Sequence, residues 1–258
     1  MSIFSAHDLT ISFGGIKALN HVSFEIEKGA VYSIIGPNGA GKTTIFNCIS
    51  GLYAPDHGEI IFQDMDITNL APYKIAGLGI ARTFQNIELF SRMTTMENLM
   101  LGRHLHMKTG LWSGVTLFSS NSKVSREEIV HRERVEIIVD LLDLQSARDV
   151  FVGELPYGSQ KLVELARALA LEPKLLLLDE PSSGMNNEEK HDLFYWIKDI
   201  RNLFDVTILM IEHDMNMVRD ISDKVLAINF GKKITAGTPD EVANHPEVLK
   251  AYLGEEDA

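Results

Sequence analysis

Glycines, one lysine and two threonines between residues 36 and 44 are the part of this sequence best suited to chemistry. They read Gly36, Pro37, Asn38, Gly39, Ala40, Gly41, Lys42, Thr43 and Thr44. Glycines let a backbone close around a phosphate chain, and successive N–H groups of such a loop form a nest for anions. Lys42 adds a full positive charge, and the Thr43 hydroxyl is an oxygen ligand of the kind that Mg²⁺ prefers. The pattern G-x-x-x-x-G-K-[ST] predicts a phosphate-binding loop.

Two adjacent carboxylates, Asp179 and Glu180, follow a run of four leucines. Such a run predicts a strand that is buried on both faces of a parallel sheet. Its C-terminal end, where ligands of α/β proteins bind, then carries both carboxylates. One of them can hold a metal ion and the other can activate a water molecule. A pair of solvated carboxylates at a strand end is the plainer alternative.

His213 follows another apolar run, residues 206–211, and is a second candidate at a strand end. A structural histidine beside a helix remains the alternative interpretation.

The elements that must position the loop are visible on both sides of it. Residues 30–35 are a short apolar run of buried-strand type, and residues 44–49 predict a helix that Gly51 ends. Strand, loop and helix therefore come in the order that a phosphate-binding loop needs. Upstream, Val22, Phe24 and Ile26 alternate with polar residues and predict a half-buried strand. Residues 58–67 predict a strand pair after the turn at residues 55–58.

The middle of the chain has a helical character and shows no clear strand signal from residue 87 to 154. Thr94 with Glu97, and Ser125 with Glu128, have the spacing of capping boxes. One apolar helix stripe then follows at Val135, Ile138, Val139 and Leu142. This region predicts a helical subdomain inserted between the halves of an α/β core.

Helical and strand signals alternate again in the last hundred residues. Residues 224–228 and 234–236 flank Gly231 as a predicted hairpin. Thr238, Pro239 and Glu241 have the pattern of a cap, a first-turn proline and a capping-box glutamate. Residues 238–258 are therefore expected to form a C-terminal helical extension with an acidic end.

The composition argues against nucleic-acid-binding, membrane-spanning and secreted proteins. The chain has 258 residues and a net charge of −12, which argues against a nucleic-acid partner. No apolar run approaches the roughly 20 residues of a membrane span, and residues 1–9 do not resemble a signal peptide. Cys48 stands alone, cannot form an internal disulfide and fits a reducing cytosol. Its simplest interpretation is a small buried hydrophobe.

Taken together, these motifs resemble the ATP-binding subunit of ATP-binding-cassette transporters over nearly the whole chain. The resemblance implies one cassette over residues 1–258, which binds ATP and Mg²⁺ and hydrolyses ATP. Its implied fold is α/β: a P-loop NTPase (RecA-like) core with an antiparallel β subdomain and an inserted α-helical subdomain, about residues 87–154.

The resemblance also implies roles for individual residues. Gln85 matches the glutamine that contacts Mg²⁺ and senses the transmembrane partner. Asp179 would hold Mg²⁺ together with Thr43, and Glu180 stands at the place of the catalytic base. His213 occupies the place of the switch histidine, and Phe13 that of an aromatic residue stacked on adenine.

Residues 155–159 occupy the place of the family's signature, Leu-Ser-Gly-Gly-Gln. The sequence departs from it at Pro156, Tyr157 and Ser159. Proline has neither a hydroxyl nor an N–H, so contact with a partner's γ-phosphate is expected from Gly158 N–H and the following helix N-terminus. Asn186 replaces the aspartate of the D-loop and keeps a hydrogen-bonding side chain.

The switch region Ile-Glu-His-Asp-Met and the ending Thr-Pro-Asp-Glu-Val…Ala-Tyr-Leu-Gly-Glu are similar to importers of branched-chain amino acids. Importers of urea or of other amides and amino acids share much of this pattern. The resemblance implies a second ATPase subunit, in a homo- or heterodimer, and transmembrane permease subunits. It places the chain peripherally on the cytoplasmic face of the cell membrane. The alternatives are a soluble non-transport cassette ATPase and a regulatory subunit with little hydrolysis.

Overall fold

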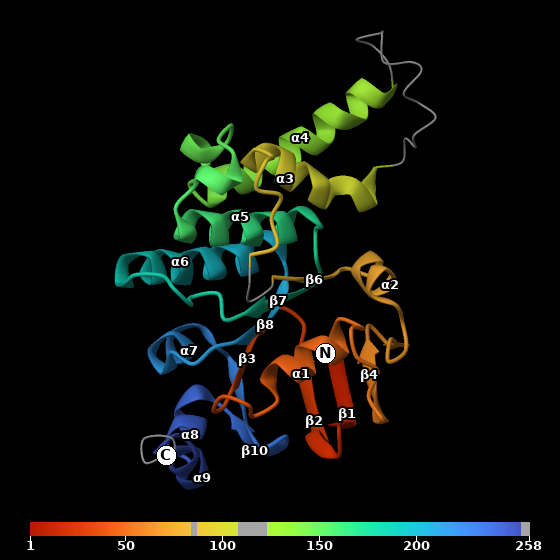
Figure 1. Ribbon diagram of the computed structural model, residues 1–258, viewed down its shortest axis with the longest axis vertical. Helices are drawn as coiled ribbons and strands as arrows, with labels where there is room; N and C mark the ends of the chain where they lie inside the picture. Colours follow the sequence, from red (N-terminus) through yellow and green to blue (C-terminus); the bar gives the residue numbers. More distant parts are fainter. Residues whose placement is uncertain (84–86, 108–122, 254–258) are drawn as a thin grey trace. The chain divides into compact units, whose positions relative to one another are not determined.

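The computed structural model of the protein describes residues 1–83, 87–107 and 123–253 (Figure 1). The chain forms two units. Unit 1 consists of Met1–Gln85, Lys174–Ser183 and Lys190–Ala258. Unit 2 consists of Asn86–Pro173 and Gly184–Glu189. Across the described ranges, no helix has both the length and the apolar character needed to cross a bilayer.

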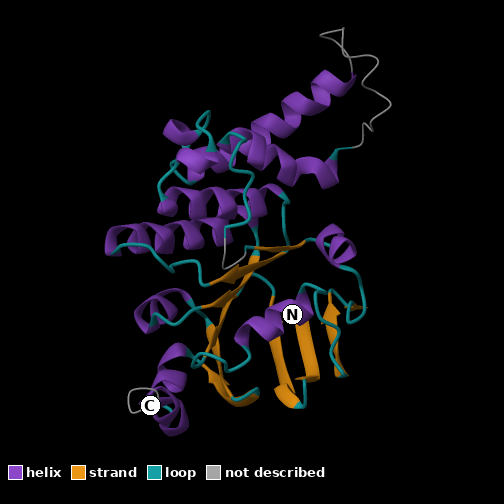
Figure 2. Ribbon diagram, in the orientation of Figure 1, coloured by secondary structure: helices purple, strands orange, loops and turns teal. Residues whose placement is uncertain are grey.

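Short strands, drawn in orange in Figure 2, build the central sheet of unit 1. Their order is β10-β9-β3-β8-β7-β6. The strands are β3 (Val31–Ile35), β6 (Ile80–Arg82), β7 (Leu175–Asp179), β8 (Thr207–Ile211), β9 (Lys224–Asn229) and β10 (Lys232–Gly237). All neighbours are parallel except β9 and β10, which form the predicted hairpin. Every residue of β3, β7 and β8 is buried, as expected for strands that are covered on both faces.

A second, antiparallel sheet in unit 1 has the order β2-β1-β4-β5. Its strands are β1 (Ser2–Phe13), β2 (Ile16–Glu27), β4 (His57–Phe62) and β5 (Met65–Asp66). Val22, Phe24 and Ile26 are buried and alternate with exposed residues, which confirms the predicted half-buried strand. The strand pair expected between residues 58 and 67 is β4 and β5. The fold class is confirmed: an α/β core carries an antiparallel β subdomain.

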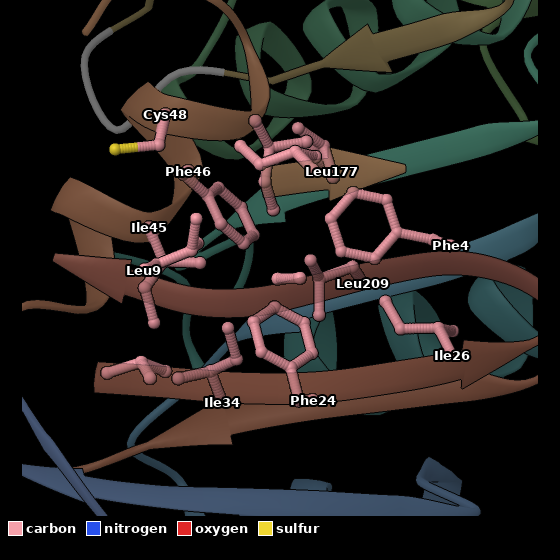
Figure 3. Packing of buried hydrophobic residues seen from close by; sticks show 14 of the residues in the cluster. Phe4, Leu9, Phe24, Ile26, Ile34, Ile45, Phe46, Cys48, Leu177 and Leu209 are labelled. Atoms are coloured by element: carbon pink, nitrogen blue, oxygen red, sulfur yellow. The ribbon is translucent and has the colours of Figure 1, made fainter. Parts of the chain in front are cut away.

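A large hydrophobic core of unit 1 joins both sheets to helix α1 (Lys42–Ile49) (Figure 3). Phe4 and Phe24 come from the antiparallel sheet, Leu177 and Leu209 from the parallel sheet, and Phe46 from α1. Cys48 lies in the same cluster, and burial, followed by the charge of Asp56, raises the pKa of its thiol to about 12. It is a small buried hydrophobe, as interpreted from the sequence.

A smaller core packs β3 and β9 with helices near the C-terminus. The remaining helices of unit 1 are α2 (Pro72–Gly77), α6 (Asn187–Phe204, in unit 1 from Lys190 onward), α7 (Met215–Ile221), α8 (Pro239–Ala243) and α9 (Pro246–Leu253). Thr238 and Glu241 form the predicted capping box. The helix that it begins is short, because Pro246 has no N–H to continue it, and α9 starts there instead.

Unit 2 is built from α3 (Thr95–Gly102), α4 (Lys123–Leu141), α5 (Tyr157–Ala170) and short 3₁₀ turns at Arg103–His106, Gln145–Ala147 and Val152–Glu154. The Thr94–Glu97 capping box is present. The predicted stripe of Val135, Ile138, Val139 and Leu142 is buried.

The expected second capping box was wrong. Helix α4 runs from Lys123, so Ser125 lies inside the helix and not at its N-terminal cap. A spacing of three residues between a serine and a glutamate also occurs inside helices, where it caps nothing.

Candidate nucleotide-binding site

The loop of residues 36–41 leaves β3 and enters α1, as the sequence predicted. Gly36 has φ +152°, and a Cβ added there would lie 2.1 Å from the carbonyl oxygen of Ile228. Gly41 has φ +105°, and its added Cβ would lie 2.6 Å from the carbonyl oxygen of Ala18. Both positions therefore require glycine, because the loop backbone presses against β9 and β2.

Lys42 begins α1, and its side chain is buried against the loop. Its Nζ donates hydrogen bonds to the carbonyl oxygens of Gly36, over 2.6 Å, and of Pro37, over 3.0 Å. These two hydrogen bonds hold the positive charge of Lys42 inside the curve of the loop. With the N-terminal N–H groups of α1, Lys42 makes the loop a site for anionic groups. Thr43 follows with an exposed side chain in the first turn of α1.

Three neighbouring parallel strands bring the other candidates to the same edge of the sheet (Figure 1). Strand β8 lies between β3 and β7, with Ile211 paired to Ile34 on one side and to Asp179 on the other. The phosphate loop, the segment after Ile211 and the carboxylates after Leu178 therefore leave the sheet at one level. This is the carboxyl edge at which ligands of α/β sheets bind.

Asp179 is the last residue of β7, and its side chain is 2% exposed. Its Oδ2 accepts a hydrogen bond from Nη2 of Arg82 over 2.7 Å, and Arg82 itself is 8% exposed. The backbone N–H of Asp179 donates to Oγ1 of Thr83 over 3.3 Å. Asp179 is thus held at its carboxylate by Arg82 and at its backbone N–H by Thr83.

Glu180 has φ +49°, a left-handed conformation that is rare for residues with a Cβ. Its N–H donates to the carbonyl oxygen of Ile211 over 3.0 Å, and its own carbonyl accepts from Ser183 N–H over 3.1 Å. Strained residues of this kind gather at functional sites, where the surrounding structure holds them. The conformation turns the chain sharply directly after Asp179.

His213 is exposed and stands in the connection between β8 and α7. Its backbone N–H donates to Oε2 of Glu212 over 3.1 Å. Glu212 is fully buried, and its Oε1 accepts from the N–H of Ser182 over 3.0 Å. One buried carboxylate therefore joins the segment that carries His213 to the segment that follows Glu180.

Phe13 ends β1, and its ring is 44% exposed. It lies edge-on to Tyr53, with 5.1 Å between the ring centroids. Tyr53 follows the end of α1, so this aromatic pair is connected to the phosphate loop through one helix. An exposed aromatic face of this kind can stack on a planar base.

The segment that replaces the signature lies in unit 2, at the start of α5. Gly158 is buried, and an added Cβ would lie 2.4 Å from Oε1 of Glu189. An added Cβ at Gly184, where φ is +78°, would lie 2.7 Å from Cε1 of Tyr157. Within unit 2 the aromatic ring of Tyr157 therefore packs on the backbone of Gly184.

Asn186, in the place of the D-loop aspartate, accepts hydrogen bonds through Oδ1 from the N–H groups of Glu188 and Glu189, over 2.9 and 3.0 Å. Glu189 Oε2 accepts from Asn186 N–H over 2.9 Å in return. This reciprocal pair is a capping box at the start of α6. The asparagine side chain therefore caps the helix that follows the loop.

Gln85 lies outside the described residues. For a metal ion, the described chain shows no group of three or more His, Cys, Asp or Glu side chains that could enclose one. What the carboxyl edge offers is a hydroxyl from Thr43 and a carboxylate from Asp179. Such a small set of hard oxygen ligands fits Mg²⁺, which keeps several waters and takes further oxygens from a phosphate chain.

Sequence reasoning missed Arg82 and Glu212. Arg82 stands in the segment Arg-Thr-Phe-Gln, but its partner Asp179 is 97 positions away. Glu212 follows strand β8 directly, as Glu180 follows β7, and that position was its only signal. No signal in the sequence pointed to the packing of Tyr157 on Gly184.

Comparison with known families agrees with this geometry. A family described as "ABC transporter" matches residues 19–183, and one described as "Branched-chain amino acid ATP-binding cassette transporter" matches residues 232–258. The chain is 40% identical over 253 residues to the high-affinity branched-chain amino acid transport ATP-binding protein LivG of Escherichia coli K12, and 41% to BraF of Pseudomonas aeruginosa PAO1. Each comparison covers 98% of both chains.

Among solved structures, the chain is similar to the ADP conformation of MJ1267, an ATP-binding cassette of an ABC transporter. The TM-score is 0.84 at 33% identity, over 98% of this chain and 99% of that one. The predicted resemblance and the predicted cassette fold are confirmed. The chain belongs to the ATP-binding-cassette transporter family, within its branched-chain amino acid group, and is an ATP-binding and ATP-hydrolysing subunit.

Proposed function

We propose that this chain is the ATPase motor of a membrane importer whose cargo is branched-chain amino acids. The observation that carries this function is the shared carboxyl edge of β3, β8 and β7, where the phosphate loop and Asp179 leave the sheet at one level. The cargo follows from the names and the C-terminal family match of its relatives. In this proposal other subunits select the cargo, because the residues of the site described here are suited to binding the phosphates of a nucleotide.

In this proposal, the N–H groups of residues 36–44 and the Lys42 ammonium group hold the β- and γ-phosphates of ATP. Phe13 stacks on the adenine. Lys42 releases its hydrogen bonds to the Gly36 and Pro37 carbonyls in favour of phosphate oxygens, which are stronger acceptors because they are charged. Positioned positive charge of this kind is the main protein contribution to phosphoryl transfer.

Thr43, Asp179 and Gln85 are the residues that would hold Mg²⁺, which would supply positive charge against the negative charge that develops during phosphoryl transfer. Glu180 orients the attacking water and takes its proton, which contributes about 10²–10⁴-fold to the rate. His213 bridges toward the γ-phosphate from the neighbouring strand end.

The working assembly in this proposal contains a second ATPase subunit and transmembrane permease subunits, on the cytoplasmic face of the membrane. Gly158 and the N-terminus of α5 bind the γ-phosphate held by the partner. Residues 87–154 act as the inserted helical subdomain of the one cassette, and residues 238–258 as its extension.

The test is reconstitution of the chain with the membrane proteins that co-purify with it. We expect ATP hydrolysis coupled to uptake of leucine and not of urea. Lys42→Ala should abolish both while the circular dichroism spectrum is unchanged. Lys28→Ala is the matched control, since Lys28 is exposed and pairs with Asp205.

Hydrolysis by Lys42→Ala at the parent rate would contradict the site. Uptake of urea in place of leucine would contradict the cargo alone. Recovery of the chain without membrane proteins would favour a soluble cassette ATPase. ATP binding without hydrolysis in the assembly would favour a regulatory subunit.

A further inference from the structure

Arg82 ends β6, and its guanidinium group joins the two elements that carry Asp179 and Thr43. Its Nη2 donates to Oδ2 of Asp179 over 2.7 Å. Its Nη1 donates to Oδ1 of Asn47 over 2.7 Å and to Oγ of Ser50 over 3.2 Å. One side chain thus connects the end of β7 to helix α1.

The contacts on α1 fall on the face that carries Thr43. Asn47 and Ser50 follow Thr43 by four and seven positions, and residues at this spacing share one side of a helix. The Cζ of Arg82 also lies 5.5 Å from the centre of the Phe46 ring, within reach of a cation–π interaction. Arg82 is therefore held in place on α1 as well as on β7.

Burial makes the Arg82–Asp179 pair necessary. A carboxylate that is 2% exposed costs much free energy unless a cation and hydrogen bonds compensate for its lost hydration. A guanidinium group is suited to this task, because its planar fork presents N–H groups in two directions at once. A lysine at position 82 would keep the charge but would offer a single nitrogen.

We propose that Arg82 is a positioning residue for the binding of magnesium nucleotide. It sets the place of the Asp179 carboxylate relative to Thr43, without contacting the nucleotide or the metal itself. This inference rests on the proposed function, in which Asp179 and Thr43 face Mg²⁺.

The test measures the affinity of the full chain for ADP by calorimetry, once in EDTA and once in saturating Mg²⁺. The ratio of the two dissociation constants is the gain that Mg²⁺ contributes. We expect Arg82→Lys to reduce this gain by about tenfold, since loss of a partner behind a metal ligand typically costs 10–100-fold in metal affinity. The affinity in EDTA should stay at the parent value.

Asn47→Ala removes the shorter of the two hydrogen bonds that Arg82 Nη1 donates toward α1 and leaves both charges of the ion pair in place. Asn47→Ala should also reduce the gain in ADP affinity from Mg²⁺, but by less than Arg82→Lys does. If Arg82→Lys does not fold, as judged by circular dichroism, this variant decides the question.

Arg201→Lys is the matched control, because Arg201 is also a partly buried arginine, paired with Asp223 over 3.2 Å and bonded to the carbonyl oxygen of Gly29 over 2.6 Å. It should lower thermal stability without changing the gain from Mg²⁺.

An unchanged gain in folded Arg82→Lys and in Asn47→Ala would overturn the inference and leave Arg82 a structural residue only. A parent chain that binds ADP equally well with and without Mg²⁺ would instead overturn the metal roles of Asp179 and Thr43, and this inference with them.

Discussion

The side chain of Glu212 accepts the N–H of His213 through Oε2 while its Oε1 accepts the N–H of Ser182, over 3.1 and 3.0 Å. The carboxylate is fully buried. It joins the segments after β8 and β7, which carry the proposed switch histidine and the proposed base. The relative position of His213 and Glu180 therefore depends on a residue that binds the backbone of both segments.

Glu212→Gln should lower the free energy of unfolding by about 1.5–3 kcal/mol, the usual value of a hydrogen bond to a charged group. The amide NH₂ group that replaces one oxygen cannot accept an N–H, so one backbone donor loses its partner. Urea unfolding measures the change. Glu247→Gln, on α9, is the control and should leave the midpoint unchanged; equal midpoints for the parent and Glu212→Gln would contradict the structural role.

Glu180→Gln should bind Mg-ATP normally and hydrolyse it about 10²–10⁴-fold more slowly, because an amide cannot take a proton from water. The variant should also accumulate a nucleotide-bound dimer, which size-exclusion chromatography with ATP would detect. Glu188→Gln, at the exposed start of α6, is the control. Full turnover by Glu180→Gln would exclude the catalytic role.

Pro156→Ser should tighten ATP-dependent dimerisation when it is added to Glu180→Gln, if the chain pairs with itself. Pro156 is the N-cap of α5, so a serine Oγ can accept from the first turn of that helix while its O–H donates to the γ-phosphate. One charge-assisted bond contributes about 1.5–3 kcal/mol at most, and loss of the rigid proline offsets part of it.

The measurement for Pro156→Ser is the dimer dissociation constant in saturating Mg-ATP. Pro156→Ala loosens the loop in the same way and has no hydroxyl, so the two variants separate the hydrogen bond from the flexibility. Equal or weaker association with serine than with alanine would show that position 156 does not face the γ-phosphate, or that the working partner is another subunit.

Asp214 should stabilise α7 in a pH-dependent way. Burial acts to raise the pKa of this carboxyl, but hydrogen bonds from the N–H groups of Met217 and Asn216 and the charge of Lys190 outweigh it, so the native pKa lies below the ordinary 3.8. A lowered native pKa means that the stabilisation is complete above pH of about 5 and is lost as the pH falls through the native value.

Asp214→Ala should therefore lower the free energy of unfolding by about 1 kcal/mol at pH 7, the usual value of an N-cap, and by progressively less toward pH 3. Urea unfolding at steps between these values measures the difference. Asp220→Ala, on the exposed side of the same helix, is the control. A difference that does not shrink with acid would show that the cap does not act through the ionised carboxylate.

The sequence alone determined the phosphate loop, the leucine strand with Asp179 and Glu180, and the class of fold. These features are local. The loop needs glycines and a lysine at fixed spacing, and a strand covered on both faces needs an unbroken apolar run. The Thr94 and Thr238 capping boxes were predictable for the same reason, whereas Ser125 with Glu128 showed that spacing alone does not reveal where a helix begins.

Only the tertiary structure decided which distant residues complete the site. Sheet order placed β8 between β3 and β7, and so brought Glu212 and His213 to the same edge as Asp179. The ion pair of Arg82 and the packing of Tyr157 on Gly184 join residues far apart in the chain, and no periodicity in sequence encodes such a pair. A charge or an aromatic ring that is removed from water needs a compensating contact. Only the fold determines which distant residue lies close enough to provide it.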